Sequence, residues 1–141
     1  MANIIPFAFR GELFSGTHDF ANGGNSFKIA LYTSNPYSTS STAYVTTNEV
    51  SASNTGYTTG GKVLASQAVA SGTAVASVDF ADSALASATF TAAFAAINNE
   101  PNADKLCVVL DFGGNKTATN GTFTISFPDP STPANAIISM A

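Results

Sequence analysis

The feature that most constrains the fold of this chain is a two-residue alternation of apolar and polar side chains. It is clearest in residues 121–127, where phenylalanine and isoleucine alternate with threonine and serine, and it recurs in residues 27–31 and 105–112. Successive side chains of a β-strand point to opposite faces, so this spacing lines one face of each strand with apolar groups. The alternation therefore predicts half-buried strands.

Further strands are expected where similar stretches lie between turn residues. About seven result, with the spacing that is typical of an antiparallel sandwich. We therefore predict an all-β fold, an antiparallel β-sandwich in a single domain over residues 1–141. One stretch, residues 87–98, is rich in alanine and could also form a helix, but its threonines favour a strand. The expected strands are residues 26–34, 62–69, 73–80, 87–98, 105–112, 121–127 and 134–140.

Two connections complete this prediction. Residues 113–120 contain glycines and asparagines that are typical of a loop, so we expect residues 121–127 to fold back on 105–112 as a hairpin. One short helix is expected over residues 6–15, because proline suits a first helical turn and a glycine follows the last. Its four large apolar side chains are predicted to share one face, which would cover a sheet as a lid or dock on a partner. These side chains are Phe7, Phe9, Leu13 and Phe14.

A long polar segment, residues 35–54, is predicted to be an excursion loop, because it is too long for a hairpin turn. Binding residues often lie on such loops. Tyr37, Tyr44 and Tyr57 lie in or beside it, and tyrosine suits protein interfaces. We predict these three tyrosines as protein-interaction residues. The alternative is that their rings anchor the loop on the edge of the sandwich.

The charge of the chain limits its partners. The net charge is −4 and the five cations are scattered, so direct binding to DNA or RNA is not expected. There is no apolar run long enough for a membrane span and no secretory signal, so we expect synthesis in a reducing cytoplasm. Only 10% of residues are charged and the mean hydropathy is +0.17. This favours a surface that is buried against copies of the chain or a partner, the alternative being a plain surface of Ser, Thr and Ala.

Motifs for chemistry are weak. Residues 56–62 fit the spacing of a phosphate-binding loop, but Val63 stands where Ser or Thr should hold magnesium, so a glycine-rich turn between strands is the better interpretation. His18 beside Asp19 is interpreted as a capping or surface residue, and Cys107 as a small buried hydrophobe. We predict no catalytic residue, no metal site and no cofactor, and hence no enzyme.

Several short stretches follow one another in the order FKIALYTS (27–34), NEVS (48–51), GYTTGGK (56–62), VDF (78–80), VLDFG (109–113) and FTISFP (123–128). This order resembles small all-β structural proteins of tailed bacteriophages that decorate or cement the head shell. The resemblance covers nearly the whole chain and brings no site motif. It implies a non-enzymatic virion protein, assembled in the bacterial cytoplasm, that binds the major capsid protein or other virion proteins as a homo-oligomer.

Two other functions remain open at this point. Some similar phage proteins are tail, baseplate or fibre components, and such a protein could use the tyrosine loop for adhesion. A small hydrolase on a β scaffold is the second, with His18 as its best candidate residue. The sparse site chemistry makes a structural role the preferred hypothesis.

Overall fold

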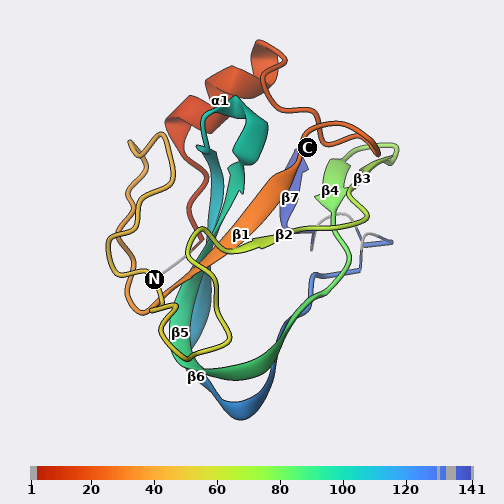
Figure 1. Ribbon diagram of the computed structural model, residues 1–141. Coiled ribbons are helices and arrows are strands. Elements are labelled where there is room, and N and C mark those ends of the chain that lie inside the picture. The colour runs from red at the N-terminus through yellow and green to blue at the C-terminus, as the bar shows by residue number, and fades with distance from the viewer. Residues whose placement is uncertain (1–2, 130, 133–135, 141) are drawn as a thin grey trace.

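The computed structural model describes residues 3–129, 131–132 and 136–140. Within these residues, the chain forms two antiparallel sheets, one short α-helix and a 3₁₀ helix, η1 (Glu100–Asn102) (Figure 1). In the first sheet, β1 (Phe27–Tyr32) lies between β2 (Lys62–Val63) and β5 (Ser83–Asn99), and β5 pairs in turn with β6 (Lys105–Ile125). The predicted all-β antiparallel sandwich with a short N-terminal helix is confirmed.

The second sheet has three short strands. Strand β4 (Ala76–Asp79) lies between β3 (Ala68–Ser71) and β7 (Ile138–Met140). The strand expected over residues 62–69 is therefore two strands in different sheets, and the backbone turns at Ser66, which has a φ of 54°. The last predicted strand, 134–140, is observed only as β7, and residues 134 and 135 lie outside the described residues.

Aromatic side chains fill the space between the two sheets. The ring of Phe27 on β1 stacks on that of Phe20, with a centroid distance of 4.3 Å. The Phe80 ring, which directly follows β4, meets both of them edge-on at 5.9 and 6.3 Å. All three side chains are buried. Since each large aromatic ring removes much apolar area from water, this cluster is a main source of stability.

Helix α1 (Phe7–Phe14) confirms the predicted helix but not its predicted face. Phe9 is buried against the core, whereas Phe7 and Phe14 are 62% and 92% exposed. The reason is the helical period: residues seven apart lie on one line, but residues 7 and 9 are about 200° apart around the axis. The helix therefore covers the sandwich with one face and presents a second aromatic face to solvent.

The β5–β6 hairpin differs most from the sequence prediction. Residues 113–120 are not a loop, because β6 continues through them to Ile125. Gly113, Gly114 and Asn120 have positive φ values of 74°, 140° and 50°, so they bend the strand through bulges instead of ending it. Residues 121–125 consequently pair with the start of β5, for example Phe123 with Leu85, and not with residues 105–112. The expected strand over residues 87–98 is confirmed within β5.

Candidate functional site

The three predicted interaction tyrosines point into the molecule. Tyr37 and Tyr57 are buried and Tyr44 is half-buried. The Tyr37 hydroxyl lies 2.6 Å from the hydroxyl of Tyr32 and accepts a hydrogen bond from the backbone N–H of Val45 at 3.1 Å. The rings therefore anchor the loop of residues 35–54, as the alternative interpretation proposed. Contact with a partner through these tyrosines stays a prediction.

Glu49, which is not among the residues predicted from the sequence, holds this loop together. Its carboxylate accepts hydrogen bonds from the hydroxyls of Tyr44 and Tyr57, each at 2.6 Å, and from the backbone N–H of Gly60 at 2.8 Å. The Tyr57 hydroxyl also accepts a bond from the backbone N–H of Leu31 at 3.0 Å. Burial first, and then the Glu49 carboxylate, raise the pKa of Tyr44 and Tyr57 above the usual range.

Substitution of Glu49 tests this anchoring role. We expect E49A to lower the free energy of unfolding by about 2–4 kcal/mol, because three donors lose a charged acceptor. E49Q is the matched control and should lose about half as much, because its amide keeps the size and one acceptor oxygen. Urea unfolding followed by circular dichroism gives both values. Equal stability of E49A and wild type would show that the loop does not depend on this carboxylate.

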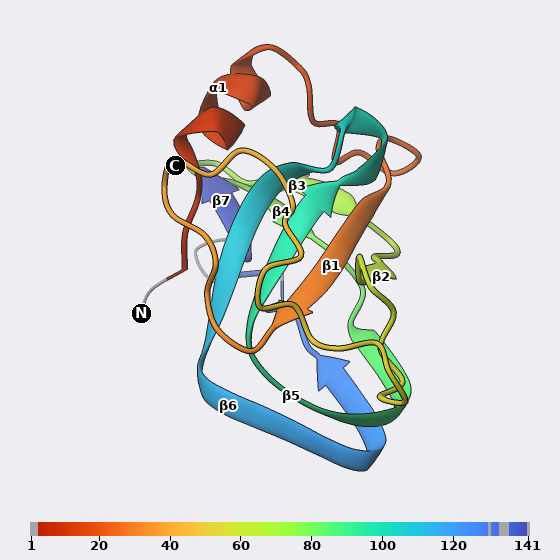
Figure 2. The same ribbon diagram turned by 60° about the vertical axis from the view of Figure 1, so that its left-hand side comes forward.

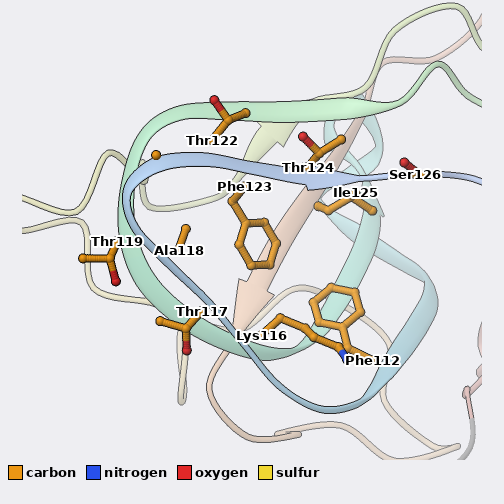
Figure 3. A pocket seen from close by; sticks show the side chains of 11 residues that line it. Phe112, Lys116, Thr117, Ala118, Thr119, Thr122, Phe123, Thr124, Ile125 and Ser126 are labelled. Atoms are coloured by element: carbon orange, nitrogen blue, oxygen red, sulfur yellow. The ribbon is translucent and has the colours of Figure 1, made fainter.

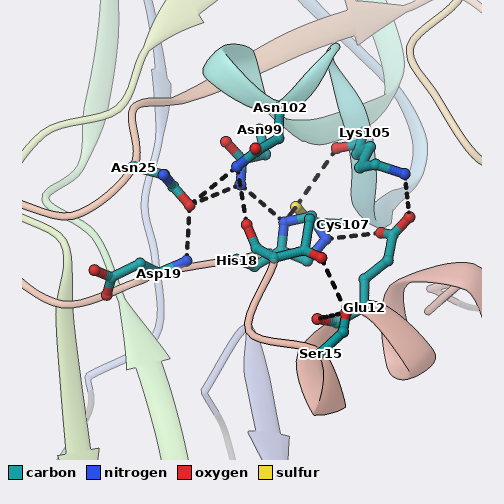
Figure 4. A network of polar contacts seen from close by, with 10 residues as sticks. Glu12, Ser15, His18, Asp19, Asn25, Asn99, Asn102, Lys105 and Cys107 are labelled. Carbon is teal, nitrogen blue, oxygen red and sulfur yellow. Dashed lines mark hydrogen bonds and ion pairs between the residues drawn. The ribbon is translucent and has the colours of Figure 1, made fainter.

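A second polar cluster surrounds His18, whose side chain is fully covered, so its interpretation as a capping or surface residue was wrong (Figure 4). Its Nε2 lies 2.8 Å from the Glu12 carboxylate, and its Nδ1 lies 2.9 Å from Asn99 Nδ2. Because the Asn99 amide nitrogen can only donate, Nδ1 accepts and Nε2–H donates to Glu12. The adjacent Asp19 does not pair with the ring: its carboxylate accepts from the backbone N–H of Ala21.

The same cluster contains Cys107, which is buried as predicted. Its sulfur lies 3.8 Å from His18 Nδ1. Burial, and to a smaller extent the Glu12 charge, raise the pKa of the thiol well above its usual range, so the nucleophilic thiolate is disfavoured. Lys105 Nζ pairs with the second oxygen of Glu12 at 2.6 Å. These bonds tie α1 to the β5–β6 end of the sheet.

The remaining sequence candidates are structural as well. Residues 58–61 form the predicted glycine turn, and β2 follows it instead of a helix. The Lys62 ammonium donates to the backbone carbonyl of Ala84. Within the described part of the chain, no group of three or more His, Cys, Asp or Glu side chains is placed to hold a metal ion. No helix among the described residues is long and apolar enough to cross a membrane.

The most distinctive outward feature is the free edge of β6. Near its start, this edge is covered: Ile4 pairs with Val109, and Leu106 N–H donates to the carbonyl of Thr42 at 3.0 Å. Beyond Asp111, no backbone hydrogen bond of the described residues joins 112–126 to a segment other than β5. Figure 2 shows this part of β6 on the outer side of the bent hairpin. We call residues 116–125 of this strand the open edge.

The open edge is almost uncharged. Lys116 is its single charged residue, and the next charge along the chain is Asp129. Strand edges in natural proteins are usually protected by charges, prolines or covering segments, because unpaired backbone groups can bind another strand. The open edge has bulges but little other protection. It is therefore a surface on which a further strand can pair.

A cavity of about 550 Å³ lies inside the bend of β6 (Figure 3). Phe123 and Ile125 point into it, whereas Thr122 and Thr124 point to the opposite side of the strand. The two threonines are exposed and the two apolar side chains are buried. Residues from Phe112 to Ser126 line the cavity: Phe112, Lys116, Thr117, Ala118, Thr119, Gly121, Thr122, Phe123, Thr124, Ile125 and Ser126.

Helix α1 presents a second surface, which we call the outer stripe and define as Phe7, Gly11 and Phe14. All three residues are exposed, and they lie four and three residues apart on one side of the helix. The Arg10 guanidinium lies 5.3 Å from the centre of the Phe7 ring. Two large exposed rings on one short helix are typical of a protein-contact surface.

Comparison with known proteins adds no assignment: no family model, curated protein or solved structure matches the chain. The candidate functional site therefore rests on the geometry described above. It consists of the open edge and the outer stripe, both of which are candidate contact surfaces. The open edge was not predicted from the sequence, because residues 113–120 are typical of a loop whereas β6 continues through them.

Proposed function

We propose that the protein is a non-enzymatic structural protein of a tailed-phage virion, which binds the assembled head shell as a homo-oligomer and stabilises it. The observation that supports this most directly is the open edge, a long, nearly uncharged strand edge without a backbone partner among the described residues. The resemblance of the sequence to decoration and cement proteins agrees with it. Both favour a protein that acts by contact.

The inward placement of the polar side chains supports the same proposal. The groups that catalysis would recruit, His18, Glu12 and Cys107, are hydrogen-bonded to one another or to neighbours inside the fold. A general base or nucleophile needs access to a substrate, whereas these side chains are covered or paired. Their contribution is therefore to stability.

Binding of this kind stabilises the shell by mass action. A ligand that binds only the assembled shell lowers the free energy of the shell relative to that of free subunits. The protein offers strand-edge hydrogen bonds along the open edge and apolar contact at the outer stripe. A decoration protein needs one surface for its own copies and another for the shell. We propose that the outer stripe meets the shell.

The test is to mix the purified protein with head shells that lack it and to measure bound protein and the temperature of shell disruption. We expect binding and a higher disruption temperature with wild type, and loss of both with F7S/F14S, which removes two exposed rings and leaves the core intact. V45S is the matched control, because Val45 is exposed apolar surface on a different segment. Absence of binding to shells, or binding of a labelled chain to tails alone, would contradict the proposal.

A further inference from the structure

We infer that the open edge pairs with the open edge of a second copy of this chain, antiparallel and across a twofold axis at Phe123. The inference deepens the proposed function, on which it rests for the homo-oligomer, by naming the partner and the register. In this arrangement Thr122 of each copy lies opposite Thr124 of the other. The four-stranded sheet then continues through β6 of both molecules.

The order of side chains along the edge fits pairing with itself. Residues 121–125 read Gly-Thr-Phe-Thr-Ile, a pattern that is nearly the same in both directions about Phe123. A twofold interface brings the same surface of two subunits together, so each side chain must suit its own symmetry mate. Cross-strand threonine pairs and aromatic pairs are among the favourable ones in antiparallel sheets. Thr122 and Thr124 are exposed, and no backbone hydrogen bond of the described residues occupies this edge.

The charge distribution also favours a second copy of the chain, and not a different protein, as the partner of the open edge. The edge carries no charged residue from Thr117 to Pro128, so it offers no charge for a partner of opposite sign to recognise. The twofold axis at Phe123 keeps the two copies of Lys116 apart at opposite ends of the paired strands. It also places each Lys116 toward the end at which the second copy carries Asp129. Both side chains are exposed and lie beyond the paired residues, so the interface buries neither charge.

The backbone geometry also favours residues 121–125 as the segment that pairs. The extra residues of β6 lie at 107, 112–115 and 119–120. The register shift opposite residues 121–123 places its extra residue on β5, so residues 121–125 of β6 carry no insertion, and Pro128 prevents further ladder pairing. The buried side chains Phe123 and Ile125 fix which face of the strand points inward. A shift of one residue would turn the threonines of one copy toward the wrong face of the other, so the register is specified.

Two charge variants test this register by analytical ultracentrifugation of the full chain over a concentration series. Wild type should be dimeric. T122K/T124K places like charges opposite each other in both symmetric pairs, and should raise the dimer dissociation constant about tenfold or more. T122K/T124E places a lysine opposite a glutamate in both pairs, and should restore the dimer. T46K/T47K is the control, because these exposed loop threonines receive the same added charge away from the edge.

Circular dichroism shows that each variant is folded before its mass is interpreted. A monomeric wild type, a dimeric T122K/T124K, or a T122K/T124E protein as weak as T122K/T124K would each overturn the inference. These outcomes are separate from shell binding. A monomer that still binds and stabilises shells would contradict the dimer and the homo-oligomeric form but not shell binding, whereas a dimer that binds no shell would contradict shell binding alone.

Discussion

Replacement of Gly61 by alanine is expected to destabilise the protein severely, whereas the same replacement at Gly60 should have a small effect. The two glycines have nearly the same positive φ, 84° at Gly61 and 89° at Gly60. They differ in their surroundings: a Cβ atom on Gly61 would overlap the backbone carbonyl of Ile29 in β1, whereas nothing lies within 4 Å of a Cβ atom on Gly60. The pair therefore separates steric overlap from backbone strain.

The expected magnitudes follow from this difference. G60A should lower the free energy of unfolding by about 1–2 kcal/mol, the usual strain of a left-handed backbone with a side chain. G61A should lower it by more than about 4 kcal/mol, because β2 must move away from β1 and lose its pairing at Lys28 and Ile29. Urea unfolding of both variants measures this. Similar losses for the two variants would show that β2 does not depend on the close approach at Gly61.

The sequence predicted most strands because their signal is local. Alternation in residues 27–31, 105–112 and 121–127 identified strand segments that the structure contains. It could not show that the last two belong to one strand, because glycine and asparagine at positive φ occur in both turns and bulges. The open edge was therefore hidden, since it exists only when β6 is continuous.

The sequence could also predict the candidate site residues only in part. The sequence placed the tyrosines around the long loop, but which way a ring points depends on distant partners, here the backbone of β1 and the Glu49 carboxylate. Glu49 itself carried a signal, because it is the single acidic residue between positions 21 and 78. The outer stripe could have been found from the helical period alone, which separates Phe7 and Phe14 from Phe9.

Alkaline pH is expected to unfold this protein steeply, beginning near pH 10. Burial is the main cause that raises the pKa of each of its four tyrosines, and hydrogen bonding adds to this at Tyr32, Tyr44 and Tyr57. The unfolded chain loses these protons near the usual tyrosine pKa of about 10, whereas the folded protein retains them. The unfolded state then binds fewer protons, so the free energy of unfolding falls as pH rises.

The size of this effect distinguishes buried from exposed tyrosines. Each proton that the folded state alone retains lowers the free energy of unfolding by about 1.4 kcal/mol for every pH unit above the usual tyrosine pKa. Within one or two pH units, the combined loss from the buried rings of Tyr32, Tyr37 and Tyr57 therefore exceeds the loss expected from any single substitution. Circular dichroism and tyrosinate absorbance, measured during one alkaline titration, should change together in a single cooperative step. The protein in urea serves as the control and should titrate gradually near the usual tyrosine pKa. Tyrosinate formation near that pKa in a protein that stays folded would mean that the rings are accessible to water, and the loop of residues 35–54 would then not be anchored by them.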